Sequence, residues 1–213
     1  PEYLVGELGD PWSAVDPGIS IKPYPSGSLS HPSMDAMRDL ILEHDIKPEQ
    51  VKSVRLGTNT RVLQPLRYDD PQNELEAKFS MKYSLGILLL NGGKGGIAQY
   101  RDEVVESPEV KAMLEKVEPF VDEEIEAMGY DLIRSKLTIE MEDCTVHEKF
   151  SDTSRGTPKR PMDREELYEK FTECCSLVYE KDQIARAEAV LYKVDTLDGV
   201  YSLIDLLGTK NEE

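Results

Sequence analysis

A single lysine, Lys22, lies in a segment that two prolines stiffen. Pro23 and Pro25 fix their own φ angles and favour an extended conformation for the residue before each of them. A lysine held in this way loses less side-chain freedom on meeting an anion than one on an exposed helix. Because Ser26 and Ser28 follow with hydroxyl groups, this segment has the side chains to bind a carboxylate or a phosphate.

The same segment runs into a predicted helix start at Ser30, His31 and Pro32. We expect Ser30 to cap the helix and Pro32 to lie in its first turn. Free backbone N–H groups at a helix start favour an anion, and a histidine can exchange a proton near neutral pH. From the residues alone, an ordinary loop entering a helix explains the pattern as well as an anion site does.

Tyr83 is a further candidate for contact with a ligand. It follows Ser80 by three positions in a segment with helical spacing and shares part of that face with Phe79. Core packing with a satisfied phenol explains this tyrosine as well as a site role does. Lys78 in the same run is predicted to form an ion pair with a nearby acid.

Other features that could suggest a ligand are interpreted as structural. The glycine-rich run 91–96 follows a predicted helix rather than a strand, which indicates a helix end and not a nucleotide-binding loop. His44 and His147 have no partner at metal-ligand spacing. The three cysteines lack the spacing of a zinc site or a disulfide framework. We therefore predict no metal site.

The charge of the chain excludes several classes of partner. With 42 acidic against 25 basic residues, the formal net charge is −17, whereas nucleic acids and membrane surfaces require a basic patch. No apolar run is long enough to span a bilayer and no signal peptide is recognisable, so we expect a cytoplasmic location. A polycarboxylate substrate would have to be held by a few local cations such as Lys22.

Hydrophobic periodicity predicts the elements that position these residues. Apolar residues recur at helical spacing over 30–44 and 74–90. Alternating residues predict half-buried strands at 51–57, 137–141 and 146–150, the last two as a hairpin. Strands in one layer and helices in the other predict an α+β fold, a two-layer α/β sandwich.

The last third of the chain has a different pattern. Helical spacing over 163–178, 182–193 and 200–207, without a strand candidate, predicts an all-helical segment whose first helix is capped by Asp163. These helices are too few for an independent core. We therefore divide the chain into a connection at 1–18, an α+β domain at 19–155 and C-terminal helices at 156–213 that complete a domain begun elsewhere.

Four segments, in the same order, resemble the MmgE/PrpD family. They are 16–26 (DPGISIKPYPS) followed by His31-Pro32 and Asp35-Ala36, 76–83 (EAKFSMKY), 107–110 (SPEV) and 155–171, which begins RGTP. The resemblance implies a protein roughly twice as long, in which this chain is the lid domain plus the return into a large helical domain that precedes it. It also implies a homodimer.

The activity that the resemblance implies is that of a lyase without metal or cofactor. A hydroxy-tricarboxylate such as 2-methylcitrate would lose water after proton abstraction next to a carboxylate. Lys22 would clamp a substrate carboxylate, His31 would donate a hydrogen bond or exchange a proton, and Tyr83 would orient a hydroxyl. Ser26 and Ser28 would contact the substrate.

Several alternatives remain open at this level. Position 27 is glycine, whereas relatives carry Cys or His close by in this motif, so we expect more room in the pocket. The choice among dehydration, decarboxylation and epimerisation therefore stays open. The general base is expected before Pro1, so residues 1–213 alone should be inactive. A noncatalytic fragment that dimerises or binds a partner through an exposed apolar face is the second hypothesis.

Overall fold

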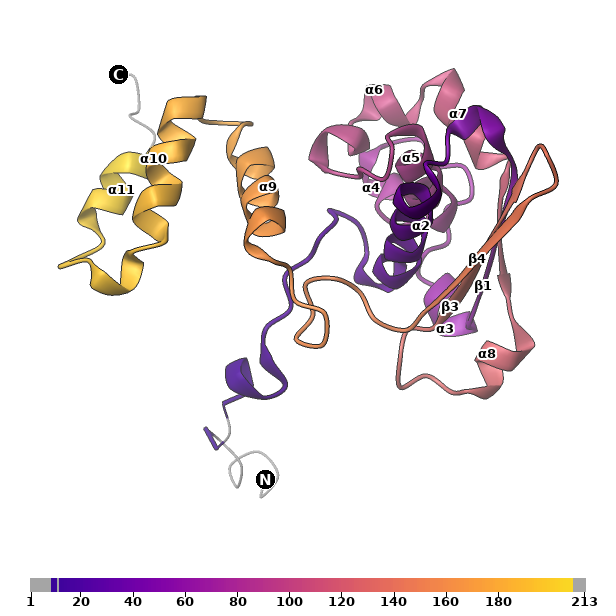
Figure 1. Cartoon of the computed structure of the whole chain (residues 1–213), viewed down its shortest axis with the longest axis horizontal. Coiled ribbons are helices and arrows are strands. Elements are labelled where there is room, and N and C mark those ends of the chain that lie inside the picture. The colour runs from indigo at the N-terminus through magenta and orange to yellow at the C-terminus, as the bar shows by residue number, and fades with distance from the viewer. Residues whose placement is uncertain (1–8, 11, 209–213) are drawn as a thin grey trace. The chain divides into compact units, whose positions relative to one another are not determined.

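A computed structural model describes residues 9, 10 and 12–208, and Figure 1 shows their course. The chain divides into two compact units, one reaching to Met162 and the other beginning at Asp163. The described strands lie in the first unit, and the second consists of helices and their connections. The domain limits expected at residues 18 and 155 concern a longer protein and stay predictions.

The first unit is built on a mixed sheet with the strand order β2-β1-β3-β4. β1 pairs parallel with β2 and antiparallel with β3, and β3 pairs antiparallel with β4. The strands are β1 (Val51–Thr58), β2 (Val117–Val121), β3 (Ser135–Met141) and β4 (Val146–Ser151). The three strands expected from alternation are confirmed. β2 was not predicted because it is short and contains Pro119, a residue that sheets tolerate at an edge.

Helices cover one face of this sheet, with α2 (His31–His44) and α5 (Met81–Leu90) packed together on it (Figure 1). Val54 and Leu56 of β1 and Leu137 of β3 are fully buried in the resulting core together with Met37 of α2. The predicted two-layer α+β fold is confirmed. The other helices of this unit are α3 (Thr60–Leu63), α4 (Glu74–Ala77), α6 (Asp102–Val105), α7 (Pro108–Leu114) and α8 (Glu123–Ala127).

The helix expected over 74–90 is in fact two helices. α4 ends at Ala77 and α5 begins at Met81. Between them Ser80 has an extended backbone, with φ −115° and ψ 120°, and its hydroxyl accepts a hydrogen bond from the Tyr83 N–H at 3.1 Å. Ser80 also pairs with Arg67 through an isolated β-bridge. The apolar period continues across the break, so periodicity alone did not reveal it.

The glycine-rich run after α5 closes that helix, as predicted. Gly92 and Gly93 have φ angles of 59° and 86°, which glycine adopts without steric cost. The Gly93 N–H donates to the Leu88 carbonyl at 2.8 Å, so the turn satisfies a carbonyl at the end of α5.

The second unit contains α9 (Arg164–Cys175), α10 (Lys181–Leu191) and α11 (Tyr201–Leu207). Asp163 caps α9 as predicted, because its carboxylate accepts from the Glu166 N–H at 2.9 Å and Glu166 accepts from the Asp163 N–H in return. Among the described residues of this unit, Ile184 and Ala187 alone are buried. Within the described part of the chain, no helix has the length and apolarity to cross a membrane.

Candidate carboxylate-binding site

Lys22 and His31 meet at one oxygen atom. The Lys22 ammonium donates to the backbone carbonyl of Ser26 at 3.1 Å, and Nε2 of His31 lies 3.3 Å from the same oxygen. Lys22 is exposed, whereas His31 at the start of α2 is only 2% exposed. The structure therefore brings two of the predicted site residues together. The Lys22 ammonium approaches the Ser26 carbonyl from the surface, and the His31 imidazole approaches it from the interior.

The serine hydroxyls near this carbonyl differ in their surroundings. The Ser26 hydroxyl is buried and lies 3.1 Å from that of Ser30, which donates to the Gly27 carbonyl at 2.8 Å. The predicted side-chain cap by Ser30 is therefore wrong, and a 3-10 turn over Ser28–Ser30 leads into α2 instead. Ser28 is exposed. Of the two serines predicted to contact the substrate, Ser28 is thus exposed to solvent, whereas the hydroxyl of Ser26 lies in the core.

Tyr83 lies in a separate apolar cluster, where its hydroxyl donates to the Gln99 carbonyl at 2.5 Å. Its ring packs 5.2 Å from that of Tyr100. Burial raises the pKa of Tyr100, and among the described residues its hydroxyl has no hydrogen-bond partner. Tyr83 thus packs against a second buried tyrosine, and the structure does not show it at the carbonyl shared by the lysine and the histidine.

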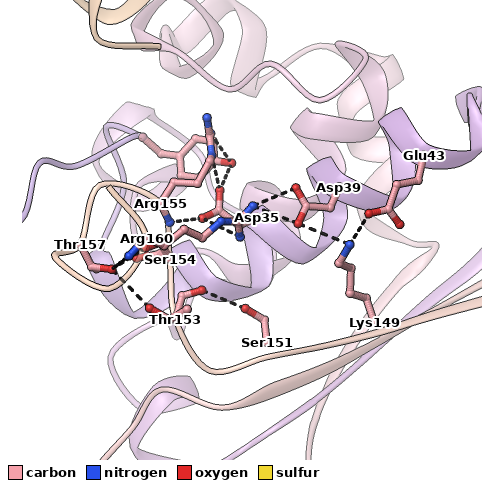
Figure 2. Close-up of polar contacts among 11 residues, drawn as sticks. Asp35, Asp39, Glu43, Lys149, Ser151, Thr153, Ser154, Arg155, Thr157 and Arg160 are labelled. Carbon is pink, nitrogen blue, oxygen red and sulfur yellow. Dashed lines mark hydrogen bonds and ion pairs between the residues drawn. The ribbon is translucent and has the colours of Figure 1, made fainter. Parts of the chain in front are cut away.

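A buried carboxylate to which the sequence analysis gave no role supports this segment. Asp35 on α2 is 0% exposed. Its Oδ1 accepts hydrogen bonds from the Tyr24 hydroxyl at 2.7 Å and from Arg155 Nε at 2.9 Å, and its Oδ2 accepts from the Arg155 backbone N–H at 2.5 Å (Figure 2). Burial, followed by the Asp35 charge, raises the pKa of Tyr24 far above its usual value. The Tyr24 ring meets the His31 ring edge-on, with centroids 5.5 Å apart.

Two signals could have pointed to this cluster. Asp35 follows His31 by four positions, one helical turn, and both Asp35 and Arg155 lie in segments that resemble the family. Sequence spacing could not join Asp35 to Arg155, because the two residues are far apart in the chain and meet only when the loop after β4 returns to α2.

The space beside Gly27 is filled rather than open. A β-carbon at this position would lie 3.2 Å from the Leu66 side chain and 3.6 Å from that of Phe79. The expectation that Gly27 leaves room in a pocket is therefore wrong. The Gly27 N–H donates to the Lys78 carbonyl at 2.9 Å, so the segment is pinned to the turn between α4 and α5.

Two predictions about other polar residues have clear outcomes. The predicted ion pair of Lys78 is formed with Glu74 at 3.4 Å. His44 and His147, treated as separate structural residues, stack on each other with centroids 4.0 Å apart. Among residues 9, 10 and 12–208, no group of three or more His, Cys, Asp or Glu side chains could hold a metal ion.

The family model of the MmgE/PrpD C-terminal domain matches residues 24–195, which include both the segment that follows Lys22 and the RGTP loop. The chain belongs to the MmgE/PrpD family. It is similar to cis-aconitate decarboxylases from Mus musculus, at 24% identity, Homo sapiens, at 22%, and Aspergillus terreus, at 24%. Each match covers 97% of this chain and 43% of the relative, so the chain spans less than half the length of these curated relatives.

Proposed function

We propose that this chain forms the carboxylate-binding part of a tricarboxylate lyase, with Lys22 as the group that binds a substrate carboxylate. The observation that carries the proposal is the convergence of Lys22 and His31 on the Ser26 carbonyl. A lysine already held by a backbone carbonyl has less freedom to lose when a carboxylate arrives. The buried His31 acts from the interior by holding the same carbonyl in place.

Decarboxylation of cis-aconitate is the reaction to test first, since three relatives are named for it. Loss of CO₂ breaks the bond between a carboxylate carbon and its neighbour, and the electron pair left behind takes up a proton. An ammonium group at a retained carboxylate stabilises the negative charge that develops. Lys22 supplies that positive charge in an otherwise acidic chain.

Dehydration of a hydroxy-tricarboxylate such as 2-methylcitrate is the second candidate. It is favoured by the exposure of Ser28, whose hydroxyl can contact a substrate hydroxyl near Lys22. Dehydration also develops negative charge next to a carboxylate, so Lys22 has the same role in both reactions.

The proposal places the proton-transferring residue on a helical domain outside this chain. The second unit supports this division of roles, because it exposes Val178 in the turn after α9 and Tyr201 and Ile204 on α11, and buries few side chains of its own. Helices of this kind need a further apolar surface to pack on.

The experiment is an assay of the longer protein that contains this chain, with cis-aconitate and with 2-methylcitrate as substrates. Lys22→Ala is compared with Lys136→Ala, a control that removes an exposed lysine paired with Glu148 on β4 at 3.7 Å. We expect Lys22→Ala to lower kcat/KM by at least about a hundredfold and Lys136→Ala to leave it unchanged. Equal activity of the two variants would contradict the proposal. Turnover of neither substrate by the unaltered protein would favour a noncatalytic role.

A further inference from the structure

The polar cluster around Asp35 joins three segments that meet at the candidate site. Asp35 lies on α2 and Arg155 lies in the loop after β4 (Figure 2), and Tyr24 lies in the Lys22 segment. Arg155 also donates from Nη2 to the Tyr24 hydroxyl at 3.1 Å, and its guanidinium lies over the Tyr24 ring at 5.6 Å. The three side chains therefore form a closed set of contacts in the interior.

Contacts from this cluster reach both members of the Lys22–His31 pair. The Tyr24 ring sets the edge-on packing of the His31 imidazole. On the other side, the Ile21 N–H donates to the carbonyl of Gly156 at 2.7 Å. Since Ile21 precedes Lys22 and Gly156 follows Arg155, this hydrogen bond connects the backbone next to Lys22 to the loop that carries Arg155.

Charge gives the cluster a second consequence. A buried carboxylate close to a site for an anion would repel that anion strongly, because charges interact over longer distances where water is excluded. Arg155 lies against Asp35 with its side chain 10% exposed and supplies the compensating positive charge. Without it, Asp35 would keep the longer ion pair of its Oδ2 with Arg160 Nη1 at 3.9 Å, and its buried charge would be less well compensated.

We infer that Arg155 is a positioning residue for the carboxylate site. Together with Asp35 and Tyr24 it holds Lys22 and His31 in place, and its positive charge compensates the buried negative charge of Asp35 beside them. This inference rests on the proposed function for the identity of the anion. The positioning itself is a property of the chain that can be measured without any ligand.

The same face of α2 provides a matched control. Asp39 and Glu43 follow Asp35 at intervals of one turn, and Arg160 contacts Asp39 at 3.1 Å while Lys149 contacts Glu43 (Figure 2). The ion-pair partners of Lys149 are Asp39 and Glu43 rather than Asp35. A substitution of Lys149 removes one cation from this row of ion pairs and leaves the Asp35 cluster intact.

The first experiment measures hydrogen exchange of the Ile21 amide in the 213-residue chain. Arg155→Gln should speed exchange at Ile21 by at least about tenfold, Arg155→Lys should give a smaller increase, and Lys149→Gln should match the unaltered chain. If Arg155→Gln does not fold, Tyr24→Phe is used instead, because it keeps the ring and removes one donor to Asp35. Exchange at Ile21 that is insensitive to both variants would overturn the inference.

The second experiment measures the affinity of the same chain for citrate by titration calorimetry. Arg155→Gln should weaken citrate binding by at least about tenfold, and the double variant Arg155→Gln with Asp35→Asn should recover much of the loss because it removes the buried charge that Arg155 no longer compensates. Citrate binding that Lys22→Ala abolishes but Arg155→Gln leaves intact would refute the inference and support the proposed function. No citrate binding by the unaltered chain would count against the proposed function, and the exchange measurement would still decide the inference.

Discussion

Gly156 is the residue at which the loop after β4 touches the Lys22 segment. Its φ angle is +79°, and a β-carbon there would lie 1.9 Å from the Ile21 carbonyl oxygen. Both the backbone conformation and the close approach require glycine. The position of Lys22 therefore depends on the absence of a side chain in a distant part of the sequence.

We expect Gly156→Ala to lower the free energy of unfolding by about 3 kcal/mol, through left-handed strain and displacement of Ile21. Gly92→Ala is the control, because Gly92 also has a positive φ, +59°, but a β-carbon there would meet no atom within 4 Å; it should cost about 1 kcal/mol. Urea unfolding of the two variants checks this difference. Equal losses would show that the approach to Ile21 is not important.

The buried tyrosines predict how stability depends on alkaline pH. Burial raises the pKa of Tyr24, Tyr83 and Tyr100. Each folded-state pKa lies above the unfolded value of about 10, so their contribution is complete below that pH and is lost as the pH rises further. The free energy of unfolding should fall above about pH 10, and less steeply in Tyr24→Phe. Urea unfolding at increasing pH measures the slopes, and identical slopes would contradict the prediction.

At this scale the sequence singled out the lysine and the histidine that share the Ser26 carbonyl, but not the residues that hold them there. Prolines beside Lys22 and the helix start at His31 are local signals. The Ser30 prediction was wrong because a hydroxyl can bond backward to Gly27 as readily as forward to the helix. Asp35, Tyr24 and Arg155 required the fold, since their contacts join the two ends of the first unit.

At the scale of secondary structure, the break between α4 and α5 matters most for the candidate site. The turn at 78–80 bonds Gly27 through the Lys78 carbonyl, and Ser80 caps the helix that carries Tyr83. A continuous helix over 74–90 would not present that carbonyl, because helical carbonyls are used within the helix. The interruption therefore helps to hold the Lys22 segment.

Ser80→Ala tests this cap. Ser80 is fully buried and its hydroxyl accepts from the Tyr83 N–H at 3.1 Å, so its loss should cost about 1 to 2 kcal/mol. Ser107 caps the shorter α7 with a longer contact of 3.4 Å to the Val110 N–H, and Ser107→Ala should cost about 0.5 kcal/mol. Chemical denaturation of both variants measures the difference. A larger loss in Ser107→Ala would contradict this account of α5.

Periodicity predicted the strands and helices that have one buried face and one face exposed to solvent. β1, β3 and β4 alternate in this way, and α2, α9 and α10 have apolar residues at helical steps. β2 escaped detection because it is five residues long with Pro119 at its centre. Short helices such as α3 and α6 span four residues each, which is too little for a period to emerge.

At the scale of the molecule, the two units differ in how much apolar surface they bury. The first has a continuous core between sheet and helices. In the second, Leu167, Phe171 and Tyr192 line a groove of about 190 Å³ between α9 and α10 rather than a filled core. Folding of so small a unit has little hydrophobic burial to offset its loss of conformational entropy.

We therefore expect an isolated peptide of residues 163–213 to lack cooperative unfolding. Its circular dichroism should change gradually on heating, because Ile184 and Ala187 are the only buried side chains in the described part of this unit. A sharp thermal transition at a concentration where the peptide is monomeric would show that these helices form their own core.

The most direct test of the central claim is a citrate titration of the 213-residue chain followed by the imidazole resonances of its three histidines. Nε2 of His31 and the Lys22 ammonium share the Ser26 carbonyl, so a carboxylate that draws the ammonium away must change the surroundings of His31. We predict that the His31 resonances shift on binding, that those of His44 and His147 stay in place, and that Lys22→Ala abolishes the response. Shifts that are equal at all three histidines, or that persist in Lys22→Ala, would contradict the account.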